Sequence, residues 1–197
     1  MQRKTHLTDE EIFELMPPET PLERRILTDP EVTEGLRWGE PRYGHPEGMV
    51  GLHIPEVLRN IDAVTPALTL EDRAFLRIVA LTHDTFKNKE HKGSPRDWTQ
   101  HHGILAKKFM EKLSTDKKLL TLLELHDEAY YAWRLDVLEK NPRACQQRLD
   151  MLLENVGDFL QLYYVFFKCD TRTGDKTQAP VSWFEQRISG IQIVEIS

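Results

Sequence analysis

The stretch LTHDTFK at residues 81–87 decides how this chain is interpreted. It closes an apolar run that starts at Phe75 and predicts a buried helix. If that helix ends in His83 and Asp84 side by side, both groups need partners, because burying an ionisable side chain without a partner or a metal ion costs free energy. The rest of the sequence should therefore supply further ligands near this helix end.

The composition is that of one ordinary globular domain. The chain has 197 residues, of which 40% are hydrophobic, enough for a sizeable core. It has no apolar run of the roughly 18 residues that a membrane helix requires, and no signal peptide is expected at its N-terminus. Its two cysteines, Cys145 and Cys169, lack metal-type spacing. We expect a cytoplasmic protein with both thiols reduced.

The net charge of −6 indicates which partners to expect. General affinity for nucleic acid needs a basic face, and an acidic chain argues against it. The charge is compatible with a small basic pocket for an anionic substrate. The sequence therefore gives no strong nucleic-acid signal and no sign of a membrane partner.

The hydrophobic periodicity predicts an all-α protein without β-hairpins. Residues 1–40 should form a short N-terminal helical cap and residues 41–197 the main helical domain. Gly and Pro residues make 38–51 a loop, and 191–196 could add a single edge strand. Helices are expected at about 9–16, 21–27, 30–37, 50–61, 69–83, 98–113, 115–139, 143–168 and 181–189.

Several histidines and aspartates lie on the apolar faces of these helices. Residues three or four apart share a helix face, so His102 faces the same way as Leu105 and Phe109. His101 is turned about 100° away and is expected as an outer-shell or surface group. The residues that should converge on one interior point are His53, His83, Asp84, His102, His126 and Asp170.

Each residue of this set also has a purely structural interpretation. A single histidine on an apolar face is usually a hydrogen-bonded core residue. Asp84 could cap the next turn, and Asp170 could face solvent at a helix end. Five or six such coincidences over several helices are harder to explain in this way. Together they predict a metal site.

The expected ligands indicate the chemistry of that site. Imidazole nitrogens and carboxylate oxygens bind borderline to hard divalent ions, here Mn, Mg, Fe, Co, Ni or Zn. Such an ion lowers the pKa of its bound water and makes hydroxide available near neutral pH. His83 and Asp84 are adjacent and cannot face the same way within a regular helix. Both can reach one ion if the helix ends there.

In order and in kind, these residues resemble the HD superfamily of metal-dependent phosphohydrolases. The resemblance covers about residues 45–176 and implies an HD-domain-like helical bundle. It matches His53 to the first histidine of the family. It matches the pair His83 and Asp84 to the doublet that names the family, and Asp170 to its last metal ligand.

Three further features extend the resemblance. Lys87 matches a lysine often found three residues after the aspartate of the doublet. His102 and His126 match two intermediate histidines, which in the family bind a second metal ion or contact the phosphate. Residues 44–48, Gly-His-Pro-Glu-Gly, look like the lead-in of HD domains attached to tRNA nucleotidyltransferases. This short similarity serves to place His53.

Two departures from the family pattern bear on the metal. Pro55 suits a first helical turn, so His53 is expected at the helix entrance. His126 is followed by Asp127, where many two-metal members have a second histidine. We therefore expect one divalent ion, with His102 and His126 as substrate or acid–base groups and a second ion bound by these two histidines as the alternative. The expected ligands of the single ion are His53, His83, Asp84 and Asp170.

The expected function is hydrolysis of a nucleotide or another small phosphate ester by a metal-activated water. The expected catalytic residues are Asp84, Lys87, His102 and His126. The expected phosphate contacts are Lys87, Arg172 and Lys176. The other basic residues that follow Lys87 are interpreted as a solvated loop, namely Lys89, Lys92 and Arg96.

Several alternatives stay open at this point. The aromatic residues Tyr130, Tyr131 and Trp133 could stack a nucleobase, although such groups more often form core or the seam of a homodimer. The chain could be a metal enzyme of another reaction type. It could also be a non-catalytic HD-fold module that binds a nucleotide or a partner protein. Residues 1–40 could either cover the pocket or only pack on the body.

Overall fold

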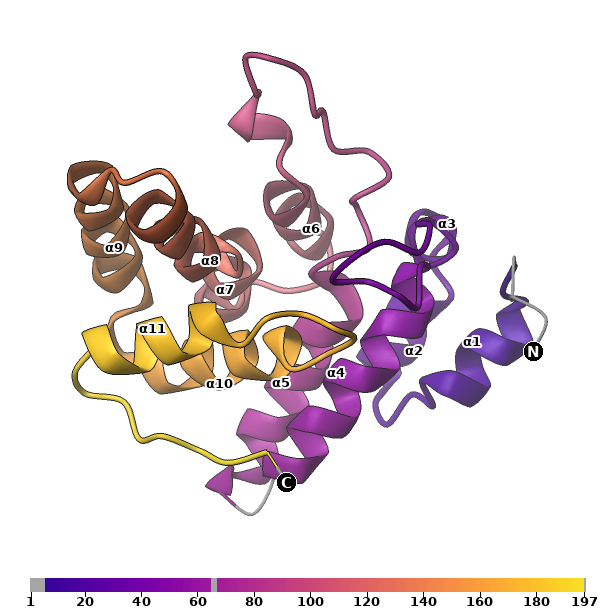
Figure 1. Cartoon of the computed structure of the whole chain (residues 1–197). Coiled ribbons are helices and arrows are strands. Elements are labelled where there is room, and N and C mark those ends of the chain that lie inside the picture. The colour runs from indigo at the N-terminus through magenta and orange to yellow at the C-terminus, as the bar shows by residue number, and fades with distance from the viewer. Residues whose placement is uncertain (1–5, 65–66, 197) are drawn as a thin grey trace.

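The computed structural model describes residues 6–64 and 67–196. These residues form helices joined by turns and loops, and no β-strand occurs among them (Figure 1). The prediction of an all-α fold is therefore confirmed. The edge strand predicted for 191–196 is wrong, because the Gln192 backbone bonds the side-chain amide of Gln161 and has no neighbouring strand to pair with.

Three short helices open the described chain, close to their predicted positions. Each begins at a side chain that accepts a hydrogen bond from the first turn, namely Thr8, Thr20 and Asp29. Their apolar faces join the same hydrophobic core as the later helices. Arg77 of the body also forms a buried ion pair with Glu23. The three helices are α1 (Asp9–Leu15), α2 (Pro21–Leu27) and α3 (Pro30–Leu36).

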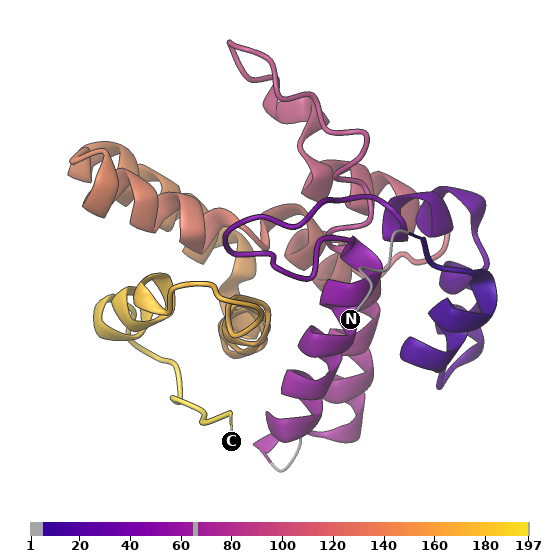
Figure 2. The same cartoon turned by 45° about the vertical axis from the view of Figure 1, so that its right-hand side comes forward.

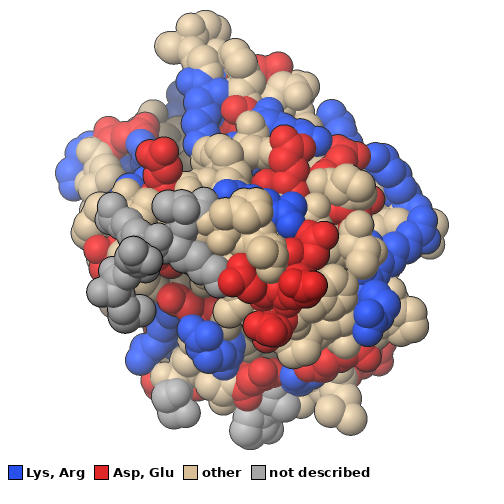
Figure 3. Space-filling model, turned by 90° about the vertical axis from the view of Figure 1, so that its right-hand side faces the viewer, with Lys and Arg blue, Asp and Glu red and all other residues tan. Residues whose placement is uncertain are grey.

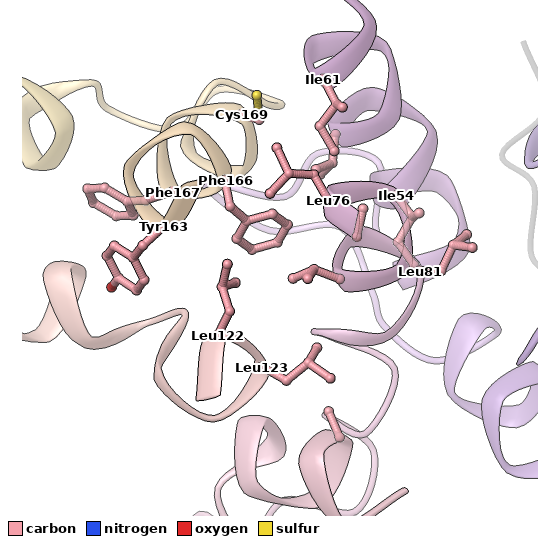
Figure 4. Close-up of a cluster of buried hydrophobic side chains, with 14 of the residues drawn as sticks. Ile54, Ile61, Leu76, Leu81, Leu122, Leu123, Tyr163, Phe166, Phe167 and Cys169 are labelled. Atoms are coloured by element: carbon pink, nitrogen blue, oxygen red, sulfur yellow. The ribbon is translucent and has the colours of Figure 1, made fainter. Parts of the chain in front are cut away.

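The centre of the fold is a pair of helices with a third packed against both. The pair is α4 (Val50–Val64) and α5 (Leu70–Thr82), and α10 (Leu160–Thr171) packs on them. Figure 4 shows Phe166 of α10 directed toward Leu76 and Leu122. Tyr163, Phe166 and Cys169 on α10 are almost fully buried. This apolar layer supports the helix ends that carry the polar residues described below.

Three helices predicted as long and continuous are interrupted. The first consists of the 3-10 turn η2 (Trp98–Gln100) and α6 (His102–Met110). The second consists of α7 (Lys117–Leu125), α8 (Glu128–Trp133) and the π-helical turn η3 (Arg134–Leu138). The third consists of α9 (Pro142–Val156), the turn η4 (Gly157–Phe159) and α10. The last helix of the described chain is α11 (Ala179–Arg187).

Specific residues account for these interruptions. The Tyr163 hydroxyl donates to Leu125 O at 3.1 Å and accepts the Ala129 N–H at 3.0 Å. It therefore satisfies backbone groups that the break after α7 leaves without helical partners. α9 ends at Gly157, whose φ of +42° disfavours any residue with a side chain. The break after α7 places His126 at a helix end.

Two irregular segments lie on the side of the bundle where these helix ends meet. Loop 38–49 connects α3 to α4, and arm 88–101 connects α5 to α6. Figure 2 shows the arm extending away from the helices and the loop running across the front of the bundle. The loop is held at its turn by a hydrogen bond from Gly44 N–H to Asp175 Oδ1, at 2.6 Å.

None of the described helices is long and apolar enough to cross a membrane. On the face shown in Figure 3, Lys and Arg side chains are mixed with Asp and Glu. This face offers no continuous basic surface of the kind that general nucleic-acid binding requires.

Candidate metal centre

Five helices bring the predicted residues to one place. His53 lies in the first turn of α4, as Pro55 leads one to expect, and Asp170 lies near the end of α10. His83 ends α5, His126 ends α7 and His102 begins α6. Each of the four histidines is at most 2% exposed. Elements far apart in the sequence therefore meet in a buried polar cluster.

Two histidines and two carboxylates form the first half of this cluster. His53 Nε2 lies 2.9 Å from Asp170 Oδ1 and 3.9 Å from Asp84 Oδ2. His83 Nε2 lies 3.7 Å and 3.6 Å from the same two oxygens. Ligand atoms about 2.1 Å from a common ion are about 3.0 Å apart at 90° and about 3.4 Å apart at the tetrahedral angle. His53, His83 and Asp84 form a group that could hold a metal ion, and Asp170 Oδ1 lies within 3.7 Å of both histidine nitrogens.

The hydrogen bonds of His83 leave one of its nitrogens for an ion. Nδ1 lies 2.9 Å from Ala80 O and must donate, since a carbonyl oxygen only accepts. Nε2 then presents its lone pair to the cluster. It is buried and has no hydrogen-bond partner among the described residues. A buried nitrogen without a partner is costly, and a cation at this position would supply the partner.

The surroundings of His53 also fit a cation. Without one, Nε2 donates to Asp170 Oδ1, and the bare Nδ1 lies buried and unpartnered within the described chain, 3.6 Å from Glu47 Oε1. If Nε2 held an ion, the ring proton would be on Nδ1 and would face the Glu47 carboxylate. Such carboxylate–histidine–metal arrangements orient the ring and raise its basicity. Glu47 is fixed by His45 Nδ1 at 3.0 Å.

The other oxygen of Asp84 faces the second half of the cluster, formed with His102, His126 and Asp127. Asp84 Oδ1 lies 3.4 Å from His102 Nε2 and 3.7 Å from His126 Nε2. Asp127 Oδ2 lies 3.3 Å and 3.8 Å from the same nitrogens. Asp127 thus supplies a carboxylate at the position where a second histidine was sought. Each half contains a group of ligand atoms within 4.8 Å of one another that could hold a metal ion.

The second half differs from the first because a proton between two of its histidine nitrogens can give both of them a hydrogen-bond partner. His126 Nδ1 donates to Leu123 O at 2.8 Å, and His102 Nδ1 lies 3.3 Å from Glu90 Oε2. Each ring therefore carries its first proton on Nδ1. The two Nε2 atoms are 3.1 Å apart, which is a hydrogen bond only if one of them carries a further proton.

The charges around His102 favour that further proton. Burial would lower the pKa of His102, but hydrogen bonds to Asp127, Asp84 and Glu90 raise it to about 10. Burial would likewise raise the pKa of Glu90, but hydrogen bonds from His102 and Arg96 lower it to about 2. Glu90 is thus a carboxylate that orients His102 from the arm.

Two lysines neutralise the carboxylates of the first half. Lys87 Nζ lies 2.5 Å from Asp84 Oδ2, and Lys176 Nζ lies 3.0 Å from Asp170 Oδ1. Burial raises the pKa of Asp84, but the charge of Lys87 and the hydrogen bond from His102 help to hold the pKa well below its usual value. Burial also raises the pKa of Asp170, but the charge of Lys176 outweighs it, and this pKa is likewise well below its usual value. Both carboxylates are therefore ionised and ready to bind a cation.

His101 lies in the outer shell and is not a surface group, since it is only 5% exposed. Its Nδ1 accepts the Gly103 N–H at 3.1 Å, so Nε2 carries the proton. Nε2 lies 3.1 Å from the Tyr131 hydroxyl and 3.5 Å from Asp127 Oδ2. The protonated Nε2 of His101 therefore faces the Asp127 carboxylate and helps to hold it in place.

A cavity of about 530 Å³ opens onto the cluster. His102, Asp127 and Asp170 line it together with Lys87 and Lys176. Two of the three phosphate contacts expected from the sequence therefore face the cavity. Its other lining residues are Arg42, Tyr43, Gly44, His45, Glu90, Lys92, Arg96, Tyr130, Tyr131, Phe167, Thr171, Thr177 and Pro180.

The lining corrects some expectations. Arg172, expected to contact phosphate, is exposed and does not line the cavity, because the chain turns after α10 and brings Lys176 there. Lys92 and Arg96 line the cavity, so they are more than the solvated loop expected for them. Tyr130 and Tyr131 line it as well, whereas the aromatic neighbour Trp133 is buried.

Residues 1–40 contribute packing in the part that the structure describes. No side chain of α1, α2 or α3 lines the cavity. Buried residues of all three helices belong to the common core. The described part of this segment therefore does not form the pocket cover that was one of the two expectations.

Three functional candidates escaped the sequence prediction. Glu47 lies inside the Gly-His-Pro-Glu-Gly stretch, which was used only to place His53. Asp127 was treated as a missing histidine, although a carboxylate is also a metal ligand. Glu90 had no signal, because its role depends on how arm 88–101 folds back onto α6.

No family model, curated protein or solved structure matches this chain. Its function is therefore inferred from the geometry of the buried cluster and of the cavity above it.

Proposed function

We propose that this protein is a metal-dependent phosphohydrolase related to the HD superfamily, acting on a nucleotide or another small phosphate ester. The observation that carries the proposal is the first half of the cluster. There, two imidazoles and two carboxylates lie at ligand spacing, and the buried His83 Nε2 has no partner in the described chain. A lysine-lined cavity beside these ligands supports an anionic substrate.

The first half would bind the ion. The nitrogens come from His53 and His83, and the oxygens from Asp84 and Asp170, in agreement with the set that the HD resemblance implies. A divalent ion bound there supplies a Lewis acid and lowers the pKa of a water molecule. The helix ends fix these side chains before substrate binds, which removes much of the reorganisation that the reaction would otherwise require.

The lysines would receive the phosphate. Lys87 and Lys176 line the cavity while their ammonium groups contact Asp84 and Asp170. When a cation neutralises these carboxylates, the lysines can turn donors toward phosphate oxygens. Hydrolysis of phosphate esters depends mainly on such positioning and charge neutralisation.

The second half would serve the leaving oxygen. His102 lines the cavity, and its Nε2 lies 3.1 Å from that of His126, so a proton shared between the two rings would lie next to the cavity. A positioned acid of this kind typically accelerates a reaction by about 10²- to 10⁴-fold. Asp127 and Glu90 hold His102 in place from two sides.

One observation favours a second candidate. The donor spacing of the second half also suits an ion, which would make a two-metal centre with Asp84 as the bridging carboxylate. A two-metal centre is compatible with phosphate ester hydrolysis and with metal enzymes of another reaction type. The number of ions bound per chain separates these candidates.

The direct test combines metal analysis with a hydrolysis screen. The purified chain is assayed for bound metal and then for hydrolysis of nucleotides and generic phosphate esters with added Mn, Mg, Co or Ni. We expect Asp84→Ala to lose both metal and hydrolysis, and Asp158→Ala, which removes an exposed aspartate on η4, to keep both. Full turnover by Asp84→Ala would contradict the proposal. Metal without hydrolysis of any ester would favour another reaction type or a binding module.

A further inference from the structure

The cavity is larger than a single phosphate group requires. Its volume of about 530 Å³ falls within the range of roughly 300–1,000 Å³ that is usual for small-molecule sites. Of the proposed metal ligands only Asp170 lines the cavity, next to Lys87 and Lys176, and we call the part that these three residues line the metal floor. The remaining walls come mainly from loop 38–49, arm 88–101 and α8. The charges on these outer walls therefore bear on the rest of the substrate.

Two basic residues of the outer walls have no acidic partner among the described residues. Five Lys or Arg residues line the cavity, and three of them form ion pairs there: Lys87, Arg96 and Lys176. The other two are Arg42 and Lys92, for which no ion pair is found within residues 6–64 and 67–196. Arg42 reaches only Glu40 O, at 3.5 Å, and Lys92 Nζ lies 5.1 Å above the Trp38 ring.

These two cavity-lining residues are connected through Trp38. Lys92 of the arm rests on Trp38, and Trp38 lines a small recess with Arg42 at the start of loop 38–49. The loop is held in place by the hydrogen bond of Gly44 to Asp175. Like charges gathered on two tethered segments repel one another until an anion binds between them.

Arg96 adds a guanidinium that is already fixed in position. It is paired with Glu90 and lies against two aromatic rings, with Cζ 4.5 Å from the Trp98 centroid and 5.5 Å from the Tyr131 centroid. The ion pair with Glu90 uses only some of the N–H donors of Arg96, because a guanidinium has five N–H groups. Such a planar, stacked arginine is well suited to bind phosphate oxygens in a bidentate manner. We call Arg42, Lys92 and Arg96 the outer cation group.

We infer that the outer cation group is a second anion subsite, and that the substrate carries a second phosphate group besides the one at the metal floor. This inference rests on the proposed phosphohydrolase function and specifies its substrate class. Glu90 neutralises one of the three cations, which leaves an excess of two positive charges for the second phosphate. The second phosphate either continues a diphosphate chain or stands on another position of the same molecule.

Equilibrium binding tests this subsite separately from hydrolysis. Adenosine serves as a common scaffold, and the probes are adenosine 5′-monophosphate, adenosine 5′-diphosphate and adenosine 3′,5′-bisphosphate. Calorimetry is done on the full chain as purified and, to exclude turnover, after metal removal with a chelator. The variants are the double substitution Arg42→Gln with Lys92→Gln, and a charge-matched control, Arg25→Gln with Lys118→Gln, at exposed residues outside the cavity.

We expect at least one two-phosphate probe to bind about 10-fold more tightly than the monophosphate, which corresponds to about 1.4 kcal/mol of binding free energy. The Arg42/Lys92 double variant should lose this gain and keep its affinity for the monophosphate, whereas the control should keep both. A diphosphate preference and a bisphosphate preference would each support the subsite and would tell the two arrangements apart. The inference is overturned if no two-phosphate probe gains affinity, or if the gain survives in the double variant.

The outcome is independent of the fate of the phosphohydrolase proposal. Loss of the gain in a chain that hydrolyses none of the esters would support the subsite and refute the enzyme. Hydrolysis of a monophosphate by a chain whose two-phosphate affinity is unaffected by the double variant would refute only the subsite.

Discussion

The two halves of the buried cluster share Asp84 and differ in how their nitrogens are satisfied. In the first half, His83 Nε2 and His53 Nδ1 are buried without hydrogen-bond partners in the described chain. In the second half, the Nε2 atoms of His102 and His126 bond each other at 3.1 Å. The two halves thus have similar ligand atoms at similar distances, but only the first leaves buried nitrogens without a hydrogen-bond partner among the described residues.

This difference assigns different tasks to the two halves. Unpartnered buried nitrogens are costly, so the first half gains most from a cation. The second half already holds a positive charge in its shared proton, surrounded by Asp84, Asp127 and Glu90. We therefore propose that the first half binds an ion tightly and that the second half donates a proton. The predictions below test this division, beginning with the largest expected effect.

Removing one nitrogen from each half should separate the two most clearly. His83→Ala should lower metal affinity by more than the roughly 100-fold that loss of an outer-shell partner can cost, and hydrolysis should disappear with the ion. His126→Ala should keep the ion, since its nitrogen belongs to the second half. Metal titration monitored by calorimetry measures both. Equal metal loss in the two variants would erase the distinction between the halves.

The second half should affect turnover more than metal binding. His102→Gln removes the shared proton while the first half keeps all four donors. We expect turnover of a cleavable phosphate ester to fall by about 10²- to 10⁴-fold, the usual contribution of a positioned acid, with metal content unchanged. A His102→Gln protein that retains wild-type turnover would exclude His102 as the acid.

The outer-shell carboxylates should show the same division at smaller scale. Glu47→Gln weakens the partner of His53 and should lower metal affinity by about 10- to 100-fold. Glu90→Gln weakens the partner of His102 and should leave metal affinity unchanged while lowering turnover. Calorimetric metal titration and initial rates on the two variants form a matched pair. The division fails if Glu90→Gln loses the ion and Glu47→Gln keeps it.

The metal-free protein should show opposite pH dependence in the two halves. Burial, followed by the charge of Lys176, lowers the pKa of His53 to about 4. The pKa of His102 is raised to about 10, because its hydrogen bonds to Asp127, Asp84 and Glu90 outweigh burial. An unfolded histidine has a pKa of about 6.5.

The sign of each effect on stability follows from linkage. Between about pH 4 and 6.5 the unfolded chain binds more protons at His53, so this residue should make the free energy of unfolding rise with pH. The contribution of His102 should be fully present below about pH 6.5 and be lost as pH rises toward 10. NMR of the ring nitrogens at pH 7.5 should find His53 neutral and His102 charged. Titration of both rings near 6.5 would contradict these environments.

The sequence was sufficient to predict which residues meet in the first half, for a physical reason. Helical periodicity tells which side of a helix is buried, and His53, His83 and Asp170 lie on such sides or at their ends. The polar residues after Asp84 indicated that the helix ends there, which lets neighbouring residues face one point. The all-α fold followed from the same periodicity.

The remaining parts of the site depend on turns and tertiary contacts. The break after His126 relies on Tyr163, which is far along the chain and invisible to local pattern. Glu90 and Arg96 reach the cavity because arm 88–101 folds back, and no periodic signal describes an irregular segment. Arg172 was expected at the phosphate because it follows Asp170, but the turn after α10 brings Lys176 there.

Metal stoichiometry tests the central claim most directly. The chain is loaded with Mn at neutral pH, freed of loosely bound metal by gel filtration, and analysed for metal and protein by elemental mass spectrometry. The account predicts one ion per chain in the wild type and in His126→Ala, and none in His83→Ala. Two tightly held ions per wild-type chain, or one ion retained by His83→Ala, would contradict it.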